Sequence, residues 1–334
     1  MAEIAILGSG GFGLSLAVMC HNMGHKVTVW SAFQDEIDTI KRTGELKVKL
    51  SGVFIPKEIE LTTDISCVSG KDMIIIGIPT SFVRSVCSQV SPYVEKKTVV
   101  VITSKGLESK TLKRMSVVVS EELPDNHVVA LTGPSHAEEV ARGMPTTIVA
   151  ACENREYADY VQETLTNKTL RIYTSEDVIG CEIGGSLKNI IAVCAGITDG
   201  MGFGDNTKAA LMTRGLSEIT RLGVALGAKA ETFMGLTGVG DLIVTCTSMH
   251  SRNRRAGILI GQGVAPEEAV RQVGTVEGYF CAETAYELAN KLNVDVPITE
   301  QLHEILFNGK SPNSALSELM GRPNRHEAEL ELYK

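Results

Sequence analysis

A glycine-rich loop near the start of this 334-residue sequence has the spacing of a nucleotide-binding turn. The stretch GSGGFG places Gly8, Gly10 and Gly13 as G-x-G-x-x-G, directly after the apolar run EIAIL. In such a loop the first glycine permits a tight turn, the second lets the backbone approach a pyrophosphate, and the third lets helix pack on strand. A glycine turn without a ligand is the alternative, but the order of strand, loop and helix favours a dinucleotide.

A second candidate for chemistry is Lys188, which stands in the apolar stretch GGSLKNIIAVCAG. At helical spacing, Ala192 and Ala195 share its face. An unpaired buried lysine is costly or loses its proton, so Lys188 either extends to water or faces a polar site. Asp199 returns to nearly the same face, which predicts a polar stripe along this helix.

Two further loops follow β-type runs and carry polar groups. Lys105 in ITSKGLE comes directly after TVVVIT, and ligands bind beyond the carboxyl ends of strands in open α/β sheets. A solvated loop lysine is the other reading. In TGPSHAEEV, Gly133 and Ser135 are placed to bind a polar ligand before a new helix, and His136 is either a general acid or base or a histidine at a helix start.

An arginine cluster lies in the second half of the chain. HSRNRRAG brings Ser251, Arg252 and Asn253 together with two more arginines, and GLTGVGDLIVTC places Asp241 after three glycines. Arginine forks bind phosphate in a bidentate manner, and serine and asparagine supply neutral donors. The alternatives are an exposed basic turn and a nucleic-acid patch.

The residues after the run KVTVW leave the choice of dinucleotide open. An acid that binds the ribose 2′-hydroxyl is expected near Trp30 and Ser31, and none is present there. Ala32, Phe33 and Gln34 follow, so no arginine is placed to bind a 2′-phosphate either. Neither NAD nor NADP is selected by a visible charge.

The secondary structure that must position these residues differs between the two halves of the chain. Up to about residue 175, short β-branched runs alternate with helical stretches, which predicts a Rossmann-like, mainly parallel doubly wound sheet. The runs are EIAIL, KVTVW, DMIIIGIP, TVVVIT, HVVALT, TTIVAA and LRIYT.

Long helical patterns replace the strands after about residue 178. We therefore expect a dinucleotide-binding α/β domain over residues 1–177 and an all-helical domain over residues 178–334. The helical patterns are CEIGGSLKNIIAVCAGITDG, NTKAALMTRGLSEITRLGVALG, PEEAVRQV, CAETAYELANKL and ITEQLHEILFNG.

Composition narrows the class of protein. A formal net charge of -8 argues against wholesale nucleic-acid binding. The eight cysteines form no CxxC pair, and the seven histidines form no HExxH, so we expect reduced thiols and no metal site. The chain opens directly into a strand, and no apolar run approaches 18 residues, so we expect a cytoplasmic protein without membrane insertion.

Taken together, the motifs resemble those of one family, the NAD(P)-dependent glycerol-3-phosphate dehydrogenases of the bacterial type. The resemblance covers nearly the whole chain. Its carriers are GSGGFG, SKGLE, GPSHAEEVA, GSLKNIIAVCAGITDGMGFGDN, GLTGVGDLIVTC, SRNRR and VEG.

The resemblance implies reduction of dihydroxyacetone phosphate to sn-glycerol 3-phosphate, and the reverse, with NAD or NADP as the cofactor. It implies that Lys188 exchanges the proton in the cleft between the domains. Matching substrate positions are Lys105, Gly133, Ser135, Lys188, Asp241, Ser251, Arg252 and Asn253. Matching cofactor positions are Gly8, Gly10, Gly11, Phe12, Gly13, Lys105, Ala137, Arg252, Val276 and Glu277.

The family often has an arginine where this chain has Ala32 and Phe33. The resemblance also implies a homodimer and a supply of glycerol 3-phosphate for glycerophospholipid synthesis. Two rivals share a Rossmann half: a related dehydrogenase of a hydroxy acid or sugar phosphate, and a dinucleotide-sensing protein without turnover.

Overall fold

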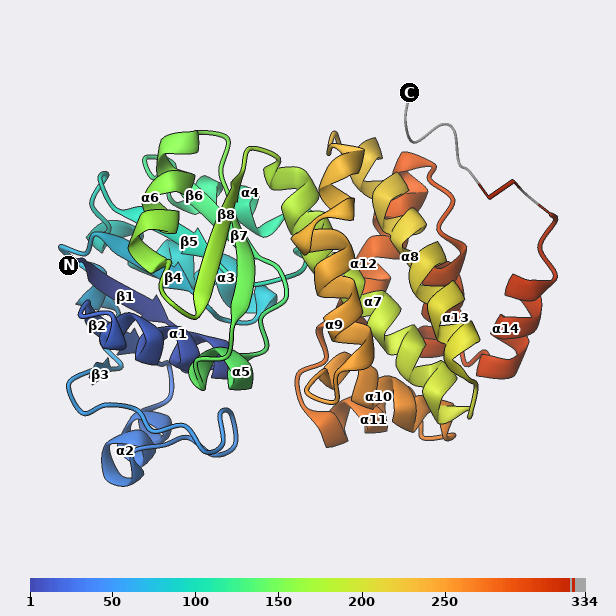
Figure 1. The fold of residues 1–334 in the computed structure, drawn as a ribbon, viewed down its shortest axis with the longest axis horizontal. Helices are drawn as coiled ribbons and strands as arrows, with labels where there is room; N and C mark the ends of the chain where they lie inside the picture. The colour runs from blue at the N-terminus through green and yellow to red at the C-terminus, as the bar shows by residue number, and fades with distance from the viewer. Residues whose placement is uncertain (325, 328–334) are drawn as a thin grey trace. The chain divides into compact units, whose positions relative to one another are not determined.

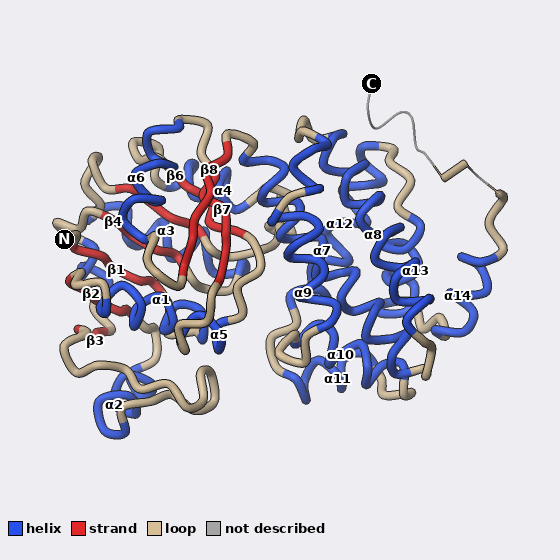
Figure 2. The backbone as a smooth tube through the Cα atoms, in the orientation of Figure 1, coloured by secondary structure: helices blue, strands red, loops and turns tan. Residues whose placement is uncertain are grey.

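The chain divides into two compact units in the computed structural model, which describes residues 1–324 and 326–327. The first unit contains Met1–Ser104 and Lys113–Val178, and the second contains Lys105–Leu112 and the chain from Ile179 onward. Within the described residues, every strand belongs to the first unit, as Figure 2 shows in red. The segment Lys105–Leu112 thus belongs to the helical unit, although it follows a strand of the first.

An eight-stranded sheet forms the centre of the first unit, in the order β3-β2-β1-β4-β5-β6-β7-β8 (Figure 1). The strands are β1 Glu3–Leu7, β2 Lys26–Trp30, β3 Glu60–Thr62, β4 Met73–Ile76, β5 Val99–Ile102, β6 Val128–Thr132, β7 Thr146–Ala151 and β8 Leu170–Ser175. Neighbouring strands are parallel except β6 and β7. The predicted Rossmann-like, mainly parallel sheet is confirmed.

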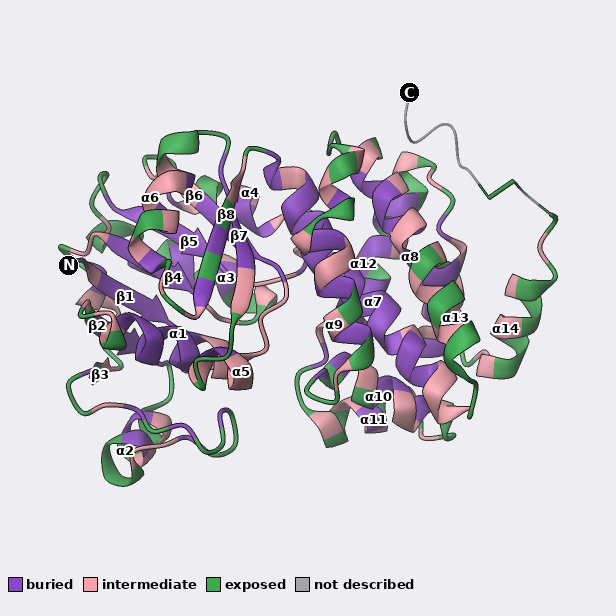
Figure 3. Cartoon of the chain, in the orientation of Figure 1, coloured by how far each residue is buried: buried purple, intermediate pink, exposed green. Residues whose placement is uncertain are grey.

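The central strands form because their β-branched residues are buried on both faces. All four residues of β4 are fully buried, as are Ile4 to Leu7 of β1, and Figure 3 shows these strands in purple. Each such aliphatic side chain contributes about 1.5–3 kcal/mol by leaving water. The sequence analysis missed β3 because its residues Glu-Leu-Thr contain no apolar run. The helices of this unit are α1 Gly11–Asn22, α2 Gln34–Thr43, α3 Thr80–Val90, α4 Met115–Glu122, α5 Ala137–Ala141 and α6 Arg155–Leu165.

The second unit is built from helices around α7, most of whose side chains are buried. The helices are α7 Val178–Gly200, α8 Asp205–Ala225, α9 Asp241–Thr247, α10 Arg252–Gly261, α11 Pro266–Val273, α12 Glu277–Leu292, α13 Pro297–Phe307 and α14 Pro312–Met320. All five predicted helices are present, within four residues at each end. Helices α9, α10 and α14 were not among the predicted helices.

Helix α7 corrects one expectation about the length of apolar segments. Among the described residues it is the one helix that is long and apolar enough to cross a membrane. Its most apolar 18-residue window is 89% buried inside the protein, as expected for the core helix of a globular unit. No uninterrupted apolar run of this length occurs in α7, because charged residues such as Glu182 and Lys188 break it.

Glycines bring the backbones of α7 and α10 into direct contact. A Cβ atom added at Gly257 would lie 2.1 Å from the carbonyl oxygen of Val193, and one at Gly196 would lie 2.1 Å from that of Arg254. One turn further along, Gly200 and Gly261 repeat the arrangement. No side chain fits at these four positions. Each helix therefore needs two glycines that are four residues apart.

We expect Gly257→Ala to lower the free energy of unfolding by about 1–3 kcal/mol, as measured by urea titration. Alanine in a helix interior is intrinsically better than glycine by about 1 kcal/mol, but its Cβ atom would force the two backbones apart. Gly204→Ser is the control, because a Cβ atom there meets nothing within 4 Å. Equal stabilities of Gly257→Ala and Gly204→Ser would show that the helices can separate without cost.

Candidate active site

The glycine-rich loop joins β1 to α1 at the carboxyl end of the sheet. Gly8 has φ +122, and a Cβ atom there would lie 2.6 Å from the carbonyl oxygen of Gly77. A Cβ atom at Gly13 would lie 2.3 Å from the carbonyl oxygen of Gly8. These two glycines are therefore required by the turn itself and by the packing of α1 on β1.

Gly10 differs from these glycines in a way that points to a ligand. A Cβ atom at Gly10 would meet only the carbonyl oxygen of Gly77, at an ordinary 3.7 Å. Gly10 is the N-cap of α1 and makes no side-chain cap, so the first N–H groups of the helix carry partial positive charge without a side-chain acceptor. The open space and these donors fit the pyrophosphate of a dinucleotide.

Other predicted residues of the first unit gather around the same loop. Gly11 approaches the backbone of Lys49, where a Cβ atom would lie 2.6 Å from its carbonyl oxygen, and the side chain of Ala137 faces Gly11. Phe12 is half-buried against the core of the unit. The structure therefore brings Gly8, Gly10, Gly11, Phe12, Gly13 and Ala137 together.

The loop after β6 is a tight turn. Gly133 has φ +117, which strongly favours glycine, and the hydroxyl of Ser135 donates to the carbonyl oxygen of Gly133 at 3.0 Å. His136 is the N-cap residue of α5, which agrees with its reading as a histidine at a helix start.

In the helical unit, Lys188 pairs with a buried carboxylate. Its ammonium nitrogen lies 2.5 Å from Oδ1 of Asp241 and donates to the hydroxyl of Thr245 at 2.7 Å. The other oxygen of Asp241 lies 2.7 Å from the ammonium nitrogen of Lys105. Lys188 is only 6% exposed and Asp241 only 1%, so Lys188 faces a polar site and does not extend to water.

Burial and the neighbouring charges set the protonation of this group. Burial lowers the pKa of Lys188 to about 8; the carboxylate of Asp241 opposes this shift and the charge of Lys105 adds to it. Burial by itself would raise the pKa of Asp241, but Lys105 and Lys188 together hold that pKa below its usual value. Asp241 is therefore ionised, and Lys188 can exchange a proton near neutral pH.

A hydrogen-bonded chain runs beside Lys188 from α7 to α10 and α12. Asn189 donates to the carboxylate of Glu277 at 3.0 Å and accepts from Asn253 at 2.9 Å. The amide oxygen of Asn253 accepts from the backbone N–H of Gly278 at 2.8 Å. Burial raises the pKa of Glu277, and the charges of Arg252 and the two lysines oppose that shift. Val276, immediately before α12, is buried.

In the arginine cluster, some side chains form contacts within the protein and others are exposed to solvent. Ser251 accepts a hydrogen bond from the backbone N–H of Arg254 and caps α10. The guanidinium of Arg254 binds Asp199 at 2.8 Å, so Asp199 anchors this arginine, and the polar stripe from Lys188 stays a prediction. The side chain of Arg252 is exposed, and within the described residues no hydrogen bond or ion pair holds it. Arg255 is exposed as well, but it is the charge of Arg252 that acts on Glu277, so Arg252 is placed to bind an anion beside that acid.

Sequence reasoning missed four polar residues that contact the predicted ones. Thr245 follows Asp241 by four residues, one helical turn, and Asn189 is next to Lys188; both spacings are visible in the sequence. Glu36 accepts a hydrogen bond from Ser31 at the end of β2 and pairs with Lys49. No local pattern marks either residue, because the rest of α2 and a loop lie between them in the sequence.

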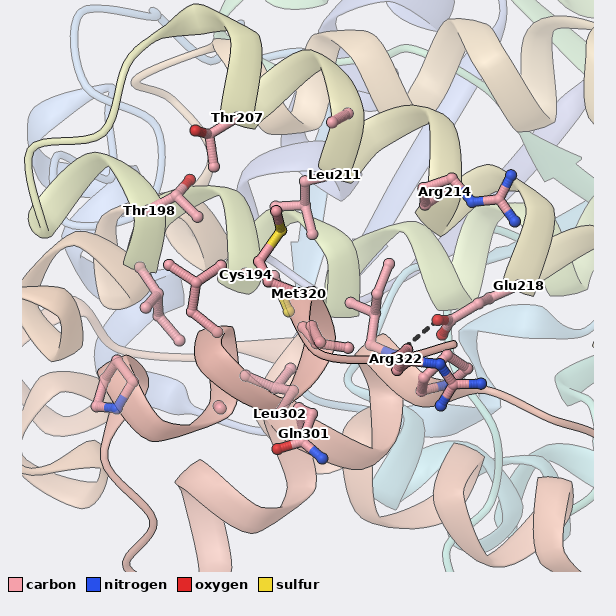
Figure 4. A pocket seen from close by; sticks show the side chains of 18 of the residues that line it. Cys194, Thr198, Thr207, Leu211, Arg214, Glu218, Gln301, Leu302, Met320 and Arg322 are labelled. Carbon is pink, nitrogen blue, oxygen red and sulfur yellow. Dashed lines mark hydrogen bonds between the residues drawn. The ribbon is translucent and has the colours of Figure 1, made fainter. Parts of the chain in front are cut away.

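A cavity in the helical unit is separate from this group. It has a volume of about 740 Å³ and is lined by apolar side chains such as Leu211, Leu302 and Met320, with Glu218 and Arg322 on one side (Figure 4). The carboxylate of Glu218 accepts from the backbone N–H of Ile298 at 2.6 Å, so it serves the N-terminus of α13. Lys105, Lys188 and Asp241 do not line this cavity.

Known proteins resemble the chain over almost its full length. Residues 3–158 match the family model for the N-terminus of NAD-dependent glycerol-3-phosphate dehydrogenase, and residues 177–317 match the model for its C-terminus. A protein of Moorella thermoacetica named glycerol-3-phosphate dehydrogenase (NAD(P)+) is 49% identical over 329 residues, 98% of this chain and 98% of its own. One of Fusobacterium nucleatum with the same name is 46% identical over 331 residues, 98% of this chain and 99% of its own.

Solved structures agree with these relatives. The crystal structure of glycerol-3-phosphate dehydrogenase from Coxiella burnetii has 36% identity and a TM-score of 0.92, and covers 96% of this chain and 99% of its own. A D-mandelate dehydrogenase, at 14% identity, a TM-score of 0.63 and coverage of 94% and 99%, shares the fold alone. The two family models match both halves of the chain, and the relatives align with almost all of its length. The chain therefore belongs to the NAD-dependent glycerol-3-phosphate dehydrogenase family.

Proposed function

We infer that this chain interconverts dihydroxyacetone phosphate and sn-glycerol 3-phosphate, with NAD or NADP as the hydride carrier. Family membership supports the reaction and the cofactor class. The observation that carries the mechanism is the buried Lys188, which is held by Asp241 and Thr245 and has a lowered pKa. A solvent-exposed lysine would have neither the fixed position nor the shifted pKa.

In this mechanism Lys188 donates a proton to the C2 oxygen when dihydroxyacetone phosphate is reduced. In the reverse direction it removes the proton from the C2 hydroxyl of glycerol 3-phosphate. Hydride transfer would be supplied by the nicotinamide when the cofactor is bound. Asp241 orients the ammonium group, and Thr245 completes its hydrogen bonds, so the acid is preorganised before substrate binds.

Substrate binding is proposed for the remaining matched residues. Arg252 is exposed and suits bidentate recognition of the phosphate, while Ser251 and Asn253 hold the start of α10 in place. The substrate set is Lys105, Gly133, Ser135, Lys188, Asp241, Ser251, Arg252 and Asn253, with Lys188 as the catalytic residue.

The cofactor set is proposed to span both halves of the chain. The open space at Gly10 supports a pyrophosphate site at the start of α1. The set is Gly8, Gly10, Gly11, Phe12, Gly13, Lys105, Ala137, Arg252, Val276 and Glu277. On this assignment residues 1–177 form the dinucleotide-binding domain and residues 178–334 the substrate-binding domain.

The biological setting follows from the family resemblance. We propose that the enzyme supplies glycerol 3-phosphate for glycerophospholipid synthesis, works in the cytoplasm as a homodimer, does not insert into membranes and does not bind nucleic acid. The burial of α7 and the net charge of -8 support the last two points.

We expect Lys188→Met to lower kcat by about 10²–10⁴ or more with dihydroxyacetone phosphate and NADH, because proton transfer and charge stabilisation are both lost. Methionine keeps the apolar stem. His136→Ala is the comparison, since His136 is the competing acid or base, and it should retain most activity. Both variants are first shown by fluorescence titration to bind NADH. A nearly active Lys188→Met together with an inactive His136→Ala would reverse the assignment.

We expect Arg252→Lys to reduce kcat/KM for dihydroxyacetone phosphate by about tenfold or more, because a point charge replaces the planar fork. Arg255→Lys is the matched control: Arg255 is exposed and lies one turn along α10. Unphosphorylated dihydroxyacetone should be a very poor substrate. Equal efficiency of the two variants, or good turnover of dihydroxyacetone by the parent, would disprove the phosphate contact.

We expect Gly10→Val to abolish measurable cofactor binding in calorimetry while leaving the thermal midpoint nearly unchanged. The protein itself has room for a Cβ atom at Gly10, so the added side chain conflicts only with the pyrophosphate. Gly13→Val is the contrast, since it should lower the thermal midpoint as well. A folded Gly10→Val that binds NADH as tightly as the parent would place the pyrophosphate elsewhere.

A further inference from the structure

An acidic side chain from α2 lies at the end of β2, although the sequence places no acid there. The carboxylate of Glu36 accepts hydrogen bonds from the hydroxyl of Ser31, at 3.1 Å, and from the hydroxyl of Ser9. Ser31 follows β2 directly, and Ser9 is the second residue of the glycine-rich loop. Glu36 is thus placed beyond the carboxyl ends of β1 and β2, beside the turn that is proposed to bind the cofactor.

Lys49 holds this carboxylate from the other side. Its ammonium nitrogen lies 2.5 Å from Oε1 of Glu36 and 5.8 Å from the ring centre of Phe33. The backbone of Lys49 also abuts Gly11. The loop that carries Lys49 therefore contacts both the glycine-rich turn and the acid.

Glu36 is accessible and charged. Its side chain is 15% exposed. Partial burial would raise the pKa of Glu36, but the hydrogen bond and charge of Lys49 and the hydroxyls of Ser9 and Ser31 together lower it. An ionised carboxylate accepts hydrogen bonds only, so it can bind a ribose hydroxyl and repels a phosphate.

We propose that the Glu36 carboxylate accepts a hydrogen bond from the adenosine 2′-hydroxyl of NAD and disfavours the 2′-phosphate of NADP. Glu36 is then the residue that sets the cofactor choice of this chain, in favour of NAD. In Rossmann folds an acid about 20 residues beyond the glycine motif takes this role. Here the first turn of α2 supplies the acid, in place of the end of β2. The inference rests on the proposed use of a dinucleotide.

The test separates recognition of the 2′-position from the rest of the cofactor and from catalysis. Calorimetry on the whole protein compares adenosine 5′-diphosphate with its 2′-phosphorylated form, two probes that differ only at the 2′-position. Activity assays then give the ratio of kcat/KM for NADH and NADPH. The variants are Glu36→Gln and, as the matched control, Asp35→Asn, an exposed acid on the same turn of α2.

The parent should bind adenosine 5′-diphosphate more tightly than its 2′-phosphorylated form. Glu36→Gln should reduce that preference by about tenfold or more, and Asp35→Asn should change it less than twofold. Lys49→Met should act in the opposite direction to Glu36→Gln, because it leaves the carboxylate without its cation. Opposite shifts distinguish an electrostatic role from general loosening of the loop, which would weaken both probes.

Several results would overturn the proposal. The role of Glu36 is wrong if Glu36→Gln keeps the parent's preference within twofold at an unchanged thermal midpoint, or if the parent prefers the 2′-phosphorylated probe. If the parent binds neither NADH nor NADPH, the proposed dinucleotide function fails as well. Binding of both cofactors with no effect of Glu36→Gln leaves the proposed function intact and removes only this inference.

Discussion

The buried carboxylate of Asp241 sets the constraint on which the helical unit depends. Its two oxygens are taken by Lys188 and Lys105, and the group is almost wholly removed from water. Removing one partner from such a group typically costs about 3–5 kcal/mol, because a buried charge is left uncompensated. The chain therefore has to deliver Lys105 to the helical unit directly after β5, which explains why Lys105–Leu112 belongs with the helices and apart from the sheet that precedes it.

Close backbone contacts on either side of Lys188 fix where its helix lies. Before the lysine, a Cβ atom at Gly184 would lie 2.5 Å from the carbonyl oxygen of Thr237, in the turn that leads into Asp241. After the lysine, Gly196 meets α10 at Arg254. Helix α7 is thus packed at atomic contact against the elements that carry the carboxylate and the arginine cluster. Small residues are what allow a lysine, an acid and an arginine from three helices to be held at fixed positions.

Structural features that depend on a local residue pattern could be predicted from the sequence. The β-branched runs of β1, β4 and β5 specify buried parallel strands, and the spacing of Gly8, Gly10 and Gly13 specifies the turn. Strand β3 was missed because three residues at a sheet edge need no apolar run. The partner of Lys188 lies 53 residues away and that of Ser9 lies 27 residues away, on α2. Such contacts are decided by packing between elements, which no periodicity records.

The charges beside Lys188 make one region of an acidic chain locally positive. Lys105, Lys188 and Arg252 supply positive charge, against the ionised Asp241 and a Glu277 whose pKa burial raises. The local balance is therefore positive although the chain carries a net charge of -8. The electric field of such a cluster is strongest where water is excluded, so this positive charge acts more on the buried group than on the surface. On the proposed assignment, a doubly charged phosphate ester bound beside Lys188 would favour the protonated form of this lysine, which is the form that reduction of a ketone requires.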